Sequence, residues 1–191
     1  MPSAAEGDPA ARPELRALRR RPLFAPLAVP ALLFAAAVGV LALLWAAQDT
    51  TTVIVVRHAE KHLDGGKDPL LTPVGQARAQ RLARQFGGAG LAAVYATPYH
   101  RTRDTAAPVA AAAGLEVSVS DPKDVAGLVA AIRADHRGQT VFVVGHSNTV
   151  GRIVQGFGGT APDEFPETEY DHIYIVTAPR FGRARTLHLS Q

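Results

Sequence analysis

The sequence of 191 residues contains no cysteine, which excludes disulfide bonds, thiolate metal sites and cysteine nucleophiles. Aromatic residues make up only 6% of the chain and hydrophobic residues 47%, so the core must be built mainly from aliphatic side chains. The formal net charge is only +3, and no basic field extends over the chain, which argues against a nucleic-acid-binding surface. The length is typical of one globular domain with accessory segments.

Residues 23–47 lack any charged or strongly polar side chain. As a helix, this run would rise about 37 Å, which is enough to cross a hydrocarbon core of about 30 Å with some tilt. Residues 1–22 are rich in proline, alanine and arginine and are expected to form a disordered basic tail. Five arginines precede the apolar run, and no basic residue follows it before Arg57. The positive-inside rule therefore predicts a single-pass anchor in the cell membrane, with a cytoplasmic N-terminus and the remainder of the chain outside the cytoplasm.

Two alternatives to an anchor are a cleaved signal peptide and a buried helix of a soluble protein. The apolar run is longer than the 7–15 residues, roughly, of a signal-peptide core, and Trp45 occupies the third position before a cut after Ala47. Both features favour an uncleaved anchor. Residues 48–52 form a short polar linker, so we expect the domain at 53–191 to work close to the membrane surface.

From Thr52 onward, strand-like and helix-like segments alternate, which predicts a layered α/β domain with a mostly parallel sheet. The expected strands are Thr52–Arg57, Ala92–Ala96, Glu116–Val119, Thr140–Val144, His172–Thr177 and Arg185–Leu189. The expected helices are Pro73–Phe86, opened by an N-cap at Thr72, then His100–Ala113, Asp124–His136 and Asn148–Phe157.

Potentially reactive residues follow three of these strands. Arg57-His58 follows the first strand, residues 97–103 follow the second, and residues 145–148 follow the fourth. Parallel strands end at one edge of a sheet, so two histidines and two arginines are expected to converge there. Arginine binds phosphate oxygens through a planar fork, a neutral histidine is a competent nucleophile, and helix N-termini add N–H donors for an anion. Together they would stabilise a transferring phosphoryl group.

These segments resemble the histidine phosphatase superfamily, which has the phosphoglycerate-mutase-like fold. The resemblance rests on four motifs in order, Arg57–Glu60, Asp68–Ala77, Ala96–Ala106 and Val144–Ser147. It covers essentially all of residues 52–191 and none of the tail or the apolar run. The resemblance implies a three-layer α/β/α sandwich preceded, in this chain, by one transmembrane helix.

The resemblance also implies a role for each matching residue. His58 would be the nucleophile that becomes phosphorylated, and Arg57, Arg101 and His146 would hold the phosphoryl oxygens. Ser147 would present its backbone N–H to the phosphate. Water would then hydrolyse the phosphohistidine, without a metal or an organic cofactor.

The proton donor to the leaving group is less defined by the sequence. Asp121 matches the position of the acid in many family members, but Asp121-Pro122 is also a typical turn and helix-entry signal. Glu60, two residues after the proposed nucleophile, and Glu169, before the fifth strand, are the alternatives. A general acid must lie within hydrogen-bond reach of the leaving oxygen.

Other charged features have simpler interpretations. His58 and His62 with Glu60 superficially suggest metal ligands, but the zincin pattern requires His-Glu-x-x-His on a helix. The acidic residues between 164 and 171 are interpreted as a solvated loop, and His136 and His188 as structural.

The sequence therefore predicts a phosphoric monoester hydrolase of the histidine acid phosphatase type, acting on a small or membrane-proximal phosphorylated substrate. The alternatives are a phosphoglycerate-type mutase, a phosphohistidine protein phosphatase and a non-catalytic phosphate-binding module on the same fold. A mutase usually needs extra enclosing segments, and the spans between the motifs are short here.

Overall fold

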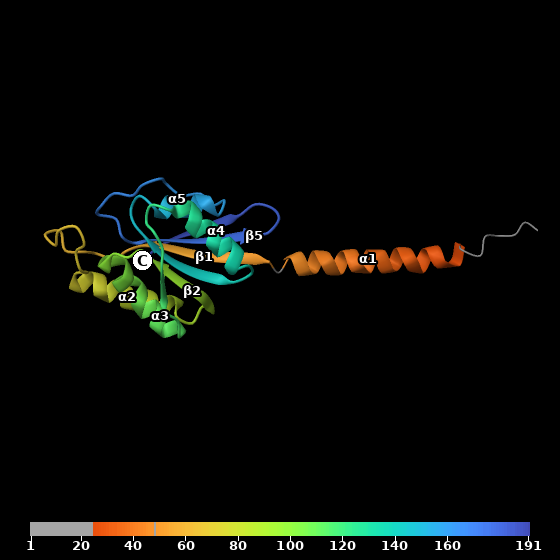
Figure 1. Cartoon of the computed structure of the whole chain (residues 1–191), viewed down its shortest axis with the longest axis horizontal. Helices are drawn as coiled ribbons and strands as arrows, with labels where there is room; N and C mark the ends of the chain where they lie inside the picture. Colours follow the sequence, from red (N-terminus) through yellow and green to blue (C-terminus); the bar gives the residue numbers. More distant parts are fainter. Residues whose placement is uncertain (1–24, 48) are drawn as a thin grey trace, which may run out of the picture. The chain divides into compact units, whose positions relative to one another are not determined.

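The computed structural model describes residues 25–47 and 49–191 (Figure 1). The predicted disordered tail at residues 1–22 lies outside the described residues. The helix α1 and the α/β domain are described separately below.

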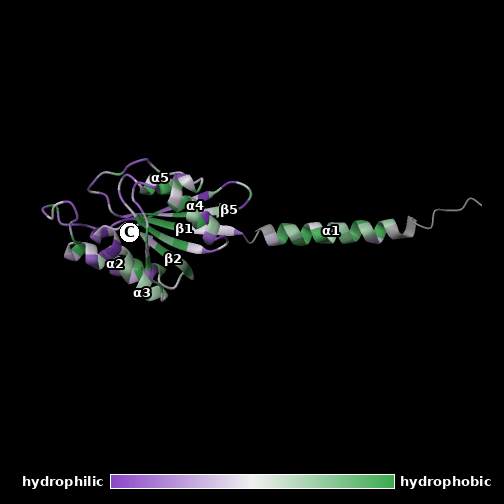
Figure 2. Cartoon of the chain, in the orientation of Figure 1, coloured by the Kyte–Doolittle hydropathy of each residue, from purple (hydrophilic) through white to green (hydrophobic). Residues whose placement is uncertain are grey.

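The helix α1 spans Ala25–Ala47 and contains Pro30. Every side chain between Ala28 and Trp45 is exposed, and Figure 2 shows the helix as hydrophobic along its length. This helix is long and apolar enough to cross a membrane, as an anchor or as a signal sequence. The exposure of its side chains argues against the other alternative considered above, a buried helix of a soluble protein.

The domain contains a six-stranded sheet in the order β3-β2-β4-β1-β5-β6. The strands are β1 (Thr50–Arg57), β2 (Leu91–Ala96), β3 (Val117–Val119), β4 (Thr140–Gly145), β5 (His172–Pro179) and β6 (Arg185–Ser190). The helices are α2 (Pro73–Phe86), α3 (His100–Ala113), α4 (Val125–Asp135) and α5 (Val150–Gly156). β1 to β4 pair in parallel, whereas β5 and β6 are antiparallel, so the predicted mostly parallel sheet is confirmed.

The β-branched run of β1 is buried on both faces of the sheet. Val53 and Val55 pack in a cluster with residues of α4 and α5, whereas Ile54 and Val56 pack with residues of α2 and α3. Figure 1 shows these two helix pairs on opposite sides of the strands. The alternation of side chains along a strand thus produces the predicted three layers.

The segment boundaries follow the predicted local signals closely. The Thr72 hydroxyl accepts the N–H of Gly75 at 3.1 Å and caps α2, and Pro73 is the first helical residue. Any side chain at Gly75 would meet the backbone of Glu60, so glycine lets α2 approach the loop that follows β1. β1 begins two residues earlier than expected, because Thr50 and Thr51 pair with Pro179 and Ala178 of β5.

Candidate active site

The carboxyl ends of β1 and β4 lie side by side and bring two histidines together. Arg57 is the register partner of Gly145, and the His58 N–H donates to the Gly145 carbonyl at 2.9 Å. The next residue on each strand is a histidine, so the rings of His58 and His146 lie edge to face with centroids 5.5 Å apart. Both residues are buried, at 2% and 8% exposure. The structure therefore places the two histidines together at the edge predicted from the sequence.

The His58 ring is held in an orientation suited to nucleophilic attack. Its Nδ1 lies 2.8 Å from the Ala59 carbonyl, and because a carbonyl only accepts, Nδ1 carries the proton and Nε2 keeps its lone pair. Burial lowers the pKa of His58 to about 3, and the charges of His146, Arg57 and Arg101 act in the same direction against the Ala59 hydrogen bond. His58 is therefore neutral at pH 7.

A chain of threonines sets the orientation of His146. His146 Nε2 lies 2.9 Å from the Thr97 hydroxyl, which lies 2.7 Å from the hydroxyl of Thr102. Thr102 in turn donates to the Tyr99 carbonyl at 2.8 Å, so Thr97 donates to Thr102 and receives the Nε2 proton of His146. His146 Nδ1 is then an acceptor, and Arg101 Nη2 faces it at 3.5 Å. Burial, followed by the charges of Arg101 and Arg57, lowers the pKa of His146 to about 4.

The Arg57 guanidinium is buried beside the histidines and is held by the loop before β5. Its Nη1 donates to the carbonyls of Pro166 and Glu169, at 2.7 and 2.8 Å. Its carbon Cζ lies 4.3 Å from the centroid of the Tyr170 ring, and that ring lies 5.9 Å from the ring of His58. The Nε atom of Arg57 is buried and has no hydrogen-bond partner among the described residues, whereas Nη2 forms an ion pair with Glu167.

The Arg101 guanidinium comes from the first turn of α3. Its Cζ lies 4.3 Å from the centroid of the Tyr99 ring, and Nη1 lies 3.5 Å from Asp68 Oδ1. Arg101 Nε is also buried without a hydrogen-bond partner in the described part of the chain. Unpaired buried N–H groups are costly, so two guanidiniums beside two neutral histidines form a site that an anion would stabilise.

Glu167 is a member of this site that the sequence analysis assigned to a solvated acidic loop. Its carboxylate lies 2.9 Å from Arg57 Nη2 and 3.4 Å from Lys61 Nζ, and it accepts the hydroxyl of Ser147 at 2.8 Å. The Ser147 hydrogen bond, together with Arg57 and Lys61, lowers the pKa of Glu167. Glu167 lies 110 positions after Arg57, in a segment without helical or strand periodicity, so no sequence pattern predicts this contact. The Glu167 carboxylate is therefore an anion that the site already holds, on the side of Arg57.

A second buried arginine, Arg78 of α2, was also missed. It is 2% exposed, its Nε and Nη2 have no hydrogen-bond partner among the described residues, and burial lowers its pKa against the attraction of Glu60 and Asp171. Arg78 therefore adds a buried positive charge that attracts the carboxylate of Glu60.

The three proposed proton donors lie in different surroundings. Asp121 is exposed, and its carboxylate accepts the N–H of Lys123 at 2.8 Å in a turn. Glu60 has a buried carboxylate oxygen with no hydrogen-bond partner among the described residues. Glu169 directs its carboxylate to His172, at 2.9 Å, whereas its backbone carbonyl accepts from Arg57. Within the described residues, no hydrogen bond or ion pair joins any of the three carboxylates to His58.

A cavity of about 240 Å³ opens beside Arg101 and His146. It is lined by Tyr99, Arg101, Pro122, Lys123, His146, Asn148 and Thr149. Asp121 lines a neighbouring cavity of about 440 Å³ that shares Tyr99, Pro122 and Lys123 with the first. Lys123 and Asn148 therefore line the cavity beside Arg101 and His146, whereas Asp121 lines only the neighbouring one of the two.

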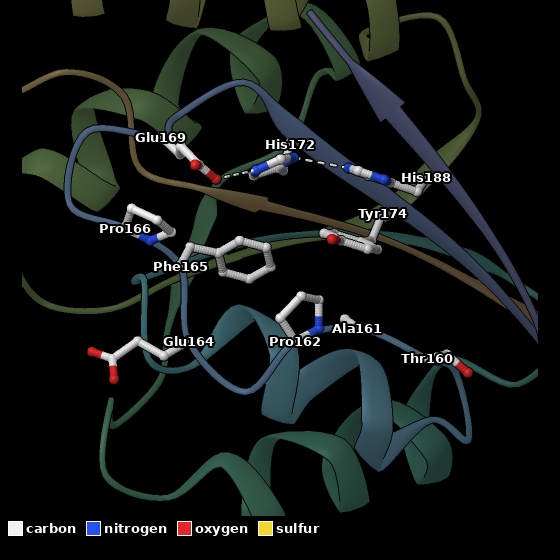
Figure 3. Close-up of a pocket in the computed structure, with 10 residues that line it drawn as sticks. All are labelled: Thr160, Ala161, Pro162, Glu164, Phe165, Pro166, Glu169, His172, Tyr174 and His188. Carbon is white, nitrogen blue, oxygen red and sulfur yellow. Dashed lines mark hydrogen bonds and ion pairs between the residues drawn. The ribbon is translucent and has the colours of Figure 1, made fainter.

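A larger cavity of about 590 Å³ lies elsewhere, between the 160–169 loop and the β5–β6 hairpin (Figure 3). Glu169, His172 and His188 form a hydrogen-bonded chain along its wall, with both links 2.9 Å long. Within residues 25–47 and 49–191, no group of three or more His, Asp or Glu side chains is arranged to hold a metal ion.

Comparisons with solved structures define the fold class. The domain is similar to the protein histidine phosphatase SixA complexed with tungstate, with a TM-score of 0.61, 23% identity, and coverage of 73% of this chain and 96% of that chain. It is similar to the phosphoserine phosphatase of Entamoeba histolytica in complex with 3-phosphoglyceric acid, with a TM-score of 0.52, 19% identity, and coverage of 66% and 90%. It is also similar to a mycobacterial glucosyl-3-phosphoglycerate phosphatase, with a TM-score of 0.58, 12% identity, and coverage of 72% and 97%. The domain has the phosphoglycerate-mutase-like α/β fold.

The sequence comparison names the family. Residues 53–122 match the profile of the histidine phosphatase superfamily (branch 1), a segment that includes Arg57, His58 and Arg101. His146 lies beyond the matched segment, and the β1–β4 pairing brings it to the same place. No match to a curated protein was found. Over residues 53–122 the chain is therefore similar to the histidine phosphatase superfamily.

Proposed function

We propose that this protein is a metal-independent phosphomonoester hydrolase that acts through a phosphohistidine on His58. The observation that supports this most is a neutral, oriented His58 beside two guanidiniums, each with a buried Nε–H that has no hydrogen-bond partner among the described residues. His58 Nε2 attacks phosphorus, and the bond from phosphorus to the leaving oxygen breaks. Arg57 and Arg101 stabilise the charge on the transferring group, and His146 holds one of its oxygens. Water then attacks the phosphohistidine and releases inorganic phosphate.

The test is hydrolysis of p-nitrophenyl phosphate by the purified full chain with EDTA present. His58→Ala should lower kcat by on the order of a thousandfold or more, because no nucleophile replaces the imidazole. The control is His62→Ala, which removes an exposed histidine from the same loop and should leave the rate unchanged. Acid-labile, base-stable phosphate on His58 should accumulate in the wild-type chain during turnover. Undiminished turnover by His58→Ala would refute the proposed nucleophile.

We assign the leaving-group proton to Asp121, with Glu60 and Glu169 as alternatives. Asp121 is near the cavity beside Arg101 and is free of ion pairs in the described residues. Asp121→Asn should slow an alkyl phosphate much more than p-nitrophenyl phosphate, because only the poor leaving group needs a proton. An equal effect on both substrates would transfer the role to Glu60 or Glu169, which the same comparison tests with Glu60→Gln and Glu169→Gln.

A phosphohistidine on another protein is the second candidate substrate. The imidazole of phosphohistidine is a better leaving group than an alkoxide, and no carboxylate among the described residues forms a hydrogen bond or ion pair with His58. The neighbour SixA, which shares the fold, is described as a protein histidine phosphatase. Faster turnover of a phosphohistidine-bearing protein than of any small phosphomonoester would favour this function, and transfer of phosphate between two positions of one substrate would instead indicate a mutase.

We further propose that α1 is retained as a membrane anchor with the domain outside the cytoplasm. The length and exposure of α1 and the five arginines that precede it support this topology. Resistance of the full chain to carbonate extraction, with protease cleavage of the domain only from the outer side of intact cells, tests the topology.

A further inference from the structure

We propose that the turn between β5 and β6, residues 180–185, lies on the surface of an anionic bilayer, with Phe181 inserted among the headgroups. This inference rests on the proposed anchoring by α1. It adds a second contact between the domain and the membrane and therefore fixes which end of the sheet faces the lipid.

The position of the turn follows from contacts inside the domain. Pro179, the last residue of β5, pairs with Thr50, the first residue of β1. The Arg180 N–H donates to the Asp49 carbonyl at 3.2 Å, and Arg180 Nη1 lies 3.3 Å from Asp49 Oδ2. The base of the turn is therefore attached to the residue at which the chain enters the domain.

The covalent chain limits how far this residue is from the membrane. Ala47 is the last residue of α1, and only Gln48 separates it from Asp49. Two residues span at most about 7 Å. The polar headgroup layer adds about 5–8 Å on each side of the hydrocarbon core. With α1 across the bilayer, Asp49 and the base of the turn lie at headgroup depth, whatever the tilt of the domain.

The residues of the turn are those that bind such a surface. The turn reads Arg-Phe-Gly-Arg-Ala-Arg, with three basic residues and no acidic residue. Phe181 is 71% exposed, and Arg180 Cζ lies 5.3 Å from the centroid of its ring. Arg180 is partly neutralised by Asp49, whereas Arg183 and Arg185 are exposed and form no ion pair with any described residue. An exposed aromatic ring followed by unpaired arginines is typical of segments that lie in the membrane interface.

The absence of cysteine makes a direct depth measurement possible. The full chain is reconstituted into nanodiscs of phosphatidylcholine with phosphatidylglycerol, and a nitroxide is attached to Phe181→Cys. The control label is at Leu63→Cys, which is 89% exposed in the loop after β1, at the carboxyl end of the sheet. We expect the label at 181 to be more accessible to oxygen than to a water-soluble nickel chelate, and the label at 63 to show the reverse. A label at 181 with the same accessibility as that at 63 would overturn the inference.

Charge removal tests the lipid chemistry. The double variant Arg183→Gln/Arg185→Gln should reduce the immersion of the label at 181 in discs that contain phosphatidylglycerol and have little effect in phosphatidylcholine alone. The affinity of a basic group near an anionic surface changes by about fivefold per charge. The matched control, Arg103→Gln/Arg152→Gln, removes the same charge from helices α3 and α5 and should leave the depth unchanged. Equal losses in the two double variants would point to net charge and refute a contact at the turn.

The outcomes separate this inference from the anchor on which it depends. Retention of the chain in the discs with a water-exposed label at 181 would refute the turn contact and leave the anchor intact. Failure of the chain to enter the discs would refute both. Phosphatase activity of the labelled Phe181→Cys chain shows that the variant is folded, because Phe181 lies outside the proposed site.

Discussion

Two histidine pairs in this domain differ in almost every respect except residue type. His58 and His146 are buried between guanidiniums, and burial lowers both pKa values, to about 3 and about 4. His172 and His188 lie on the β5–β6 edge, hydrogen-bonded to each other at 2.9 Å, with the carboxylate of Glu169 beside them. The first pair faces cations that would attract a phosphate, whereas the second faces an anion that would repel it. Surroundings, rather than the presence of two imidazoles, therefore distinguish the candidate active site.

The largest expected difference between the two pairs is the loss of kcat/KM when one histidine of each pair is replaced. His146→Ala should lower kcat/KM for p-nitrophenyl phosphate by on the order of a thousandfold, because it removes a phosphoryl ligand. His188→Ala should leave it within about threefold, because His188 contacts His172 and Tyr174 rather than the groups proposed to bind the phosphate. Steady-state kinetics of the two variants make the measurement, and a similar loss in both would show that the second pair also supports catalysis.

The charge on the guanidiniums should matter less than their geometry. Arg57→Lys keeps the positive charge. A lysine, however, lacks the planar set of donors that lets a guanidinium bind the carbonyls of Pro166 and Glu169 and also present N–H groups to a bound phosphate. We expect kcat to fall by about a hundredfold, as for loss of a bidentate anion ligand. Arg152→Lys, an exposed position on α5, is the matched control. A fully active Arg57→Lys chain would show that a point charge is sufficient there.

The pH profile should reveal the depressed pKa values. A protonated imidazole has no lone pair for phosphorus, so activity requires neutral His58. With a pKa of about 3 for His58, kcat/KM, corrected for ionisation of the substrate, should stay level as the pH falls from 7 to about 5 and then decrease. A decrease centred near 6.5 would show an ordinary histidine and contradict the buried cationic environment.

The smallest expected effect concerns Glu167, whose carboxylate occupies the anion-binding groups Arg57, Lys61 and Ser147. Glu167→Gln should tighten inhibition by vanadate by about three- to tenfold, because a competing anion is removed from a largely exposed position. Glu164→Gln in the same loop is the control. Weaker inhibition together with slower cleavage of alkyl phosphates would instead identify Glu167 as a proton donor.

The parts of the fold that depend on local signals were predictable from the sequence. Thr72-Pro73 predicts the first turn of α2, and the β-branched run before Arg57 predicts a central buried strand. The convergence of His58 and His146 followed from the rule that parallel strands end at one edge.

The loop between α5 and β5 was not predictable in the same way. Its Tyr170 packs against Arg57, and its Glu167 binds Ser147, but the loop has no period that relates it to the sheet. Carbonyls cannot be recognised as ligands from sequence, because every residue has one. The loop nevertheless holds the guanidinium on which the proposed phosphate site depends.

The entry of the chain at Thr50 and the reactive groups after Arg57 lie at opposite ends of one strand. Seven residues of strand extend about 23 Å. A domain standing with this strand along the membrane normal would hold His58 above the headgroups. In that orientation it would reach a phosphate on a dissolved molecule, or at the far end of a long headgroup, more readily than one at the bilayer surface.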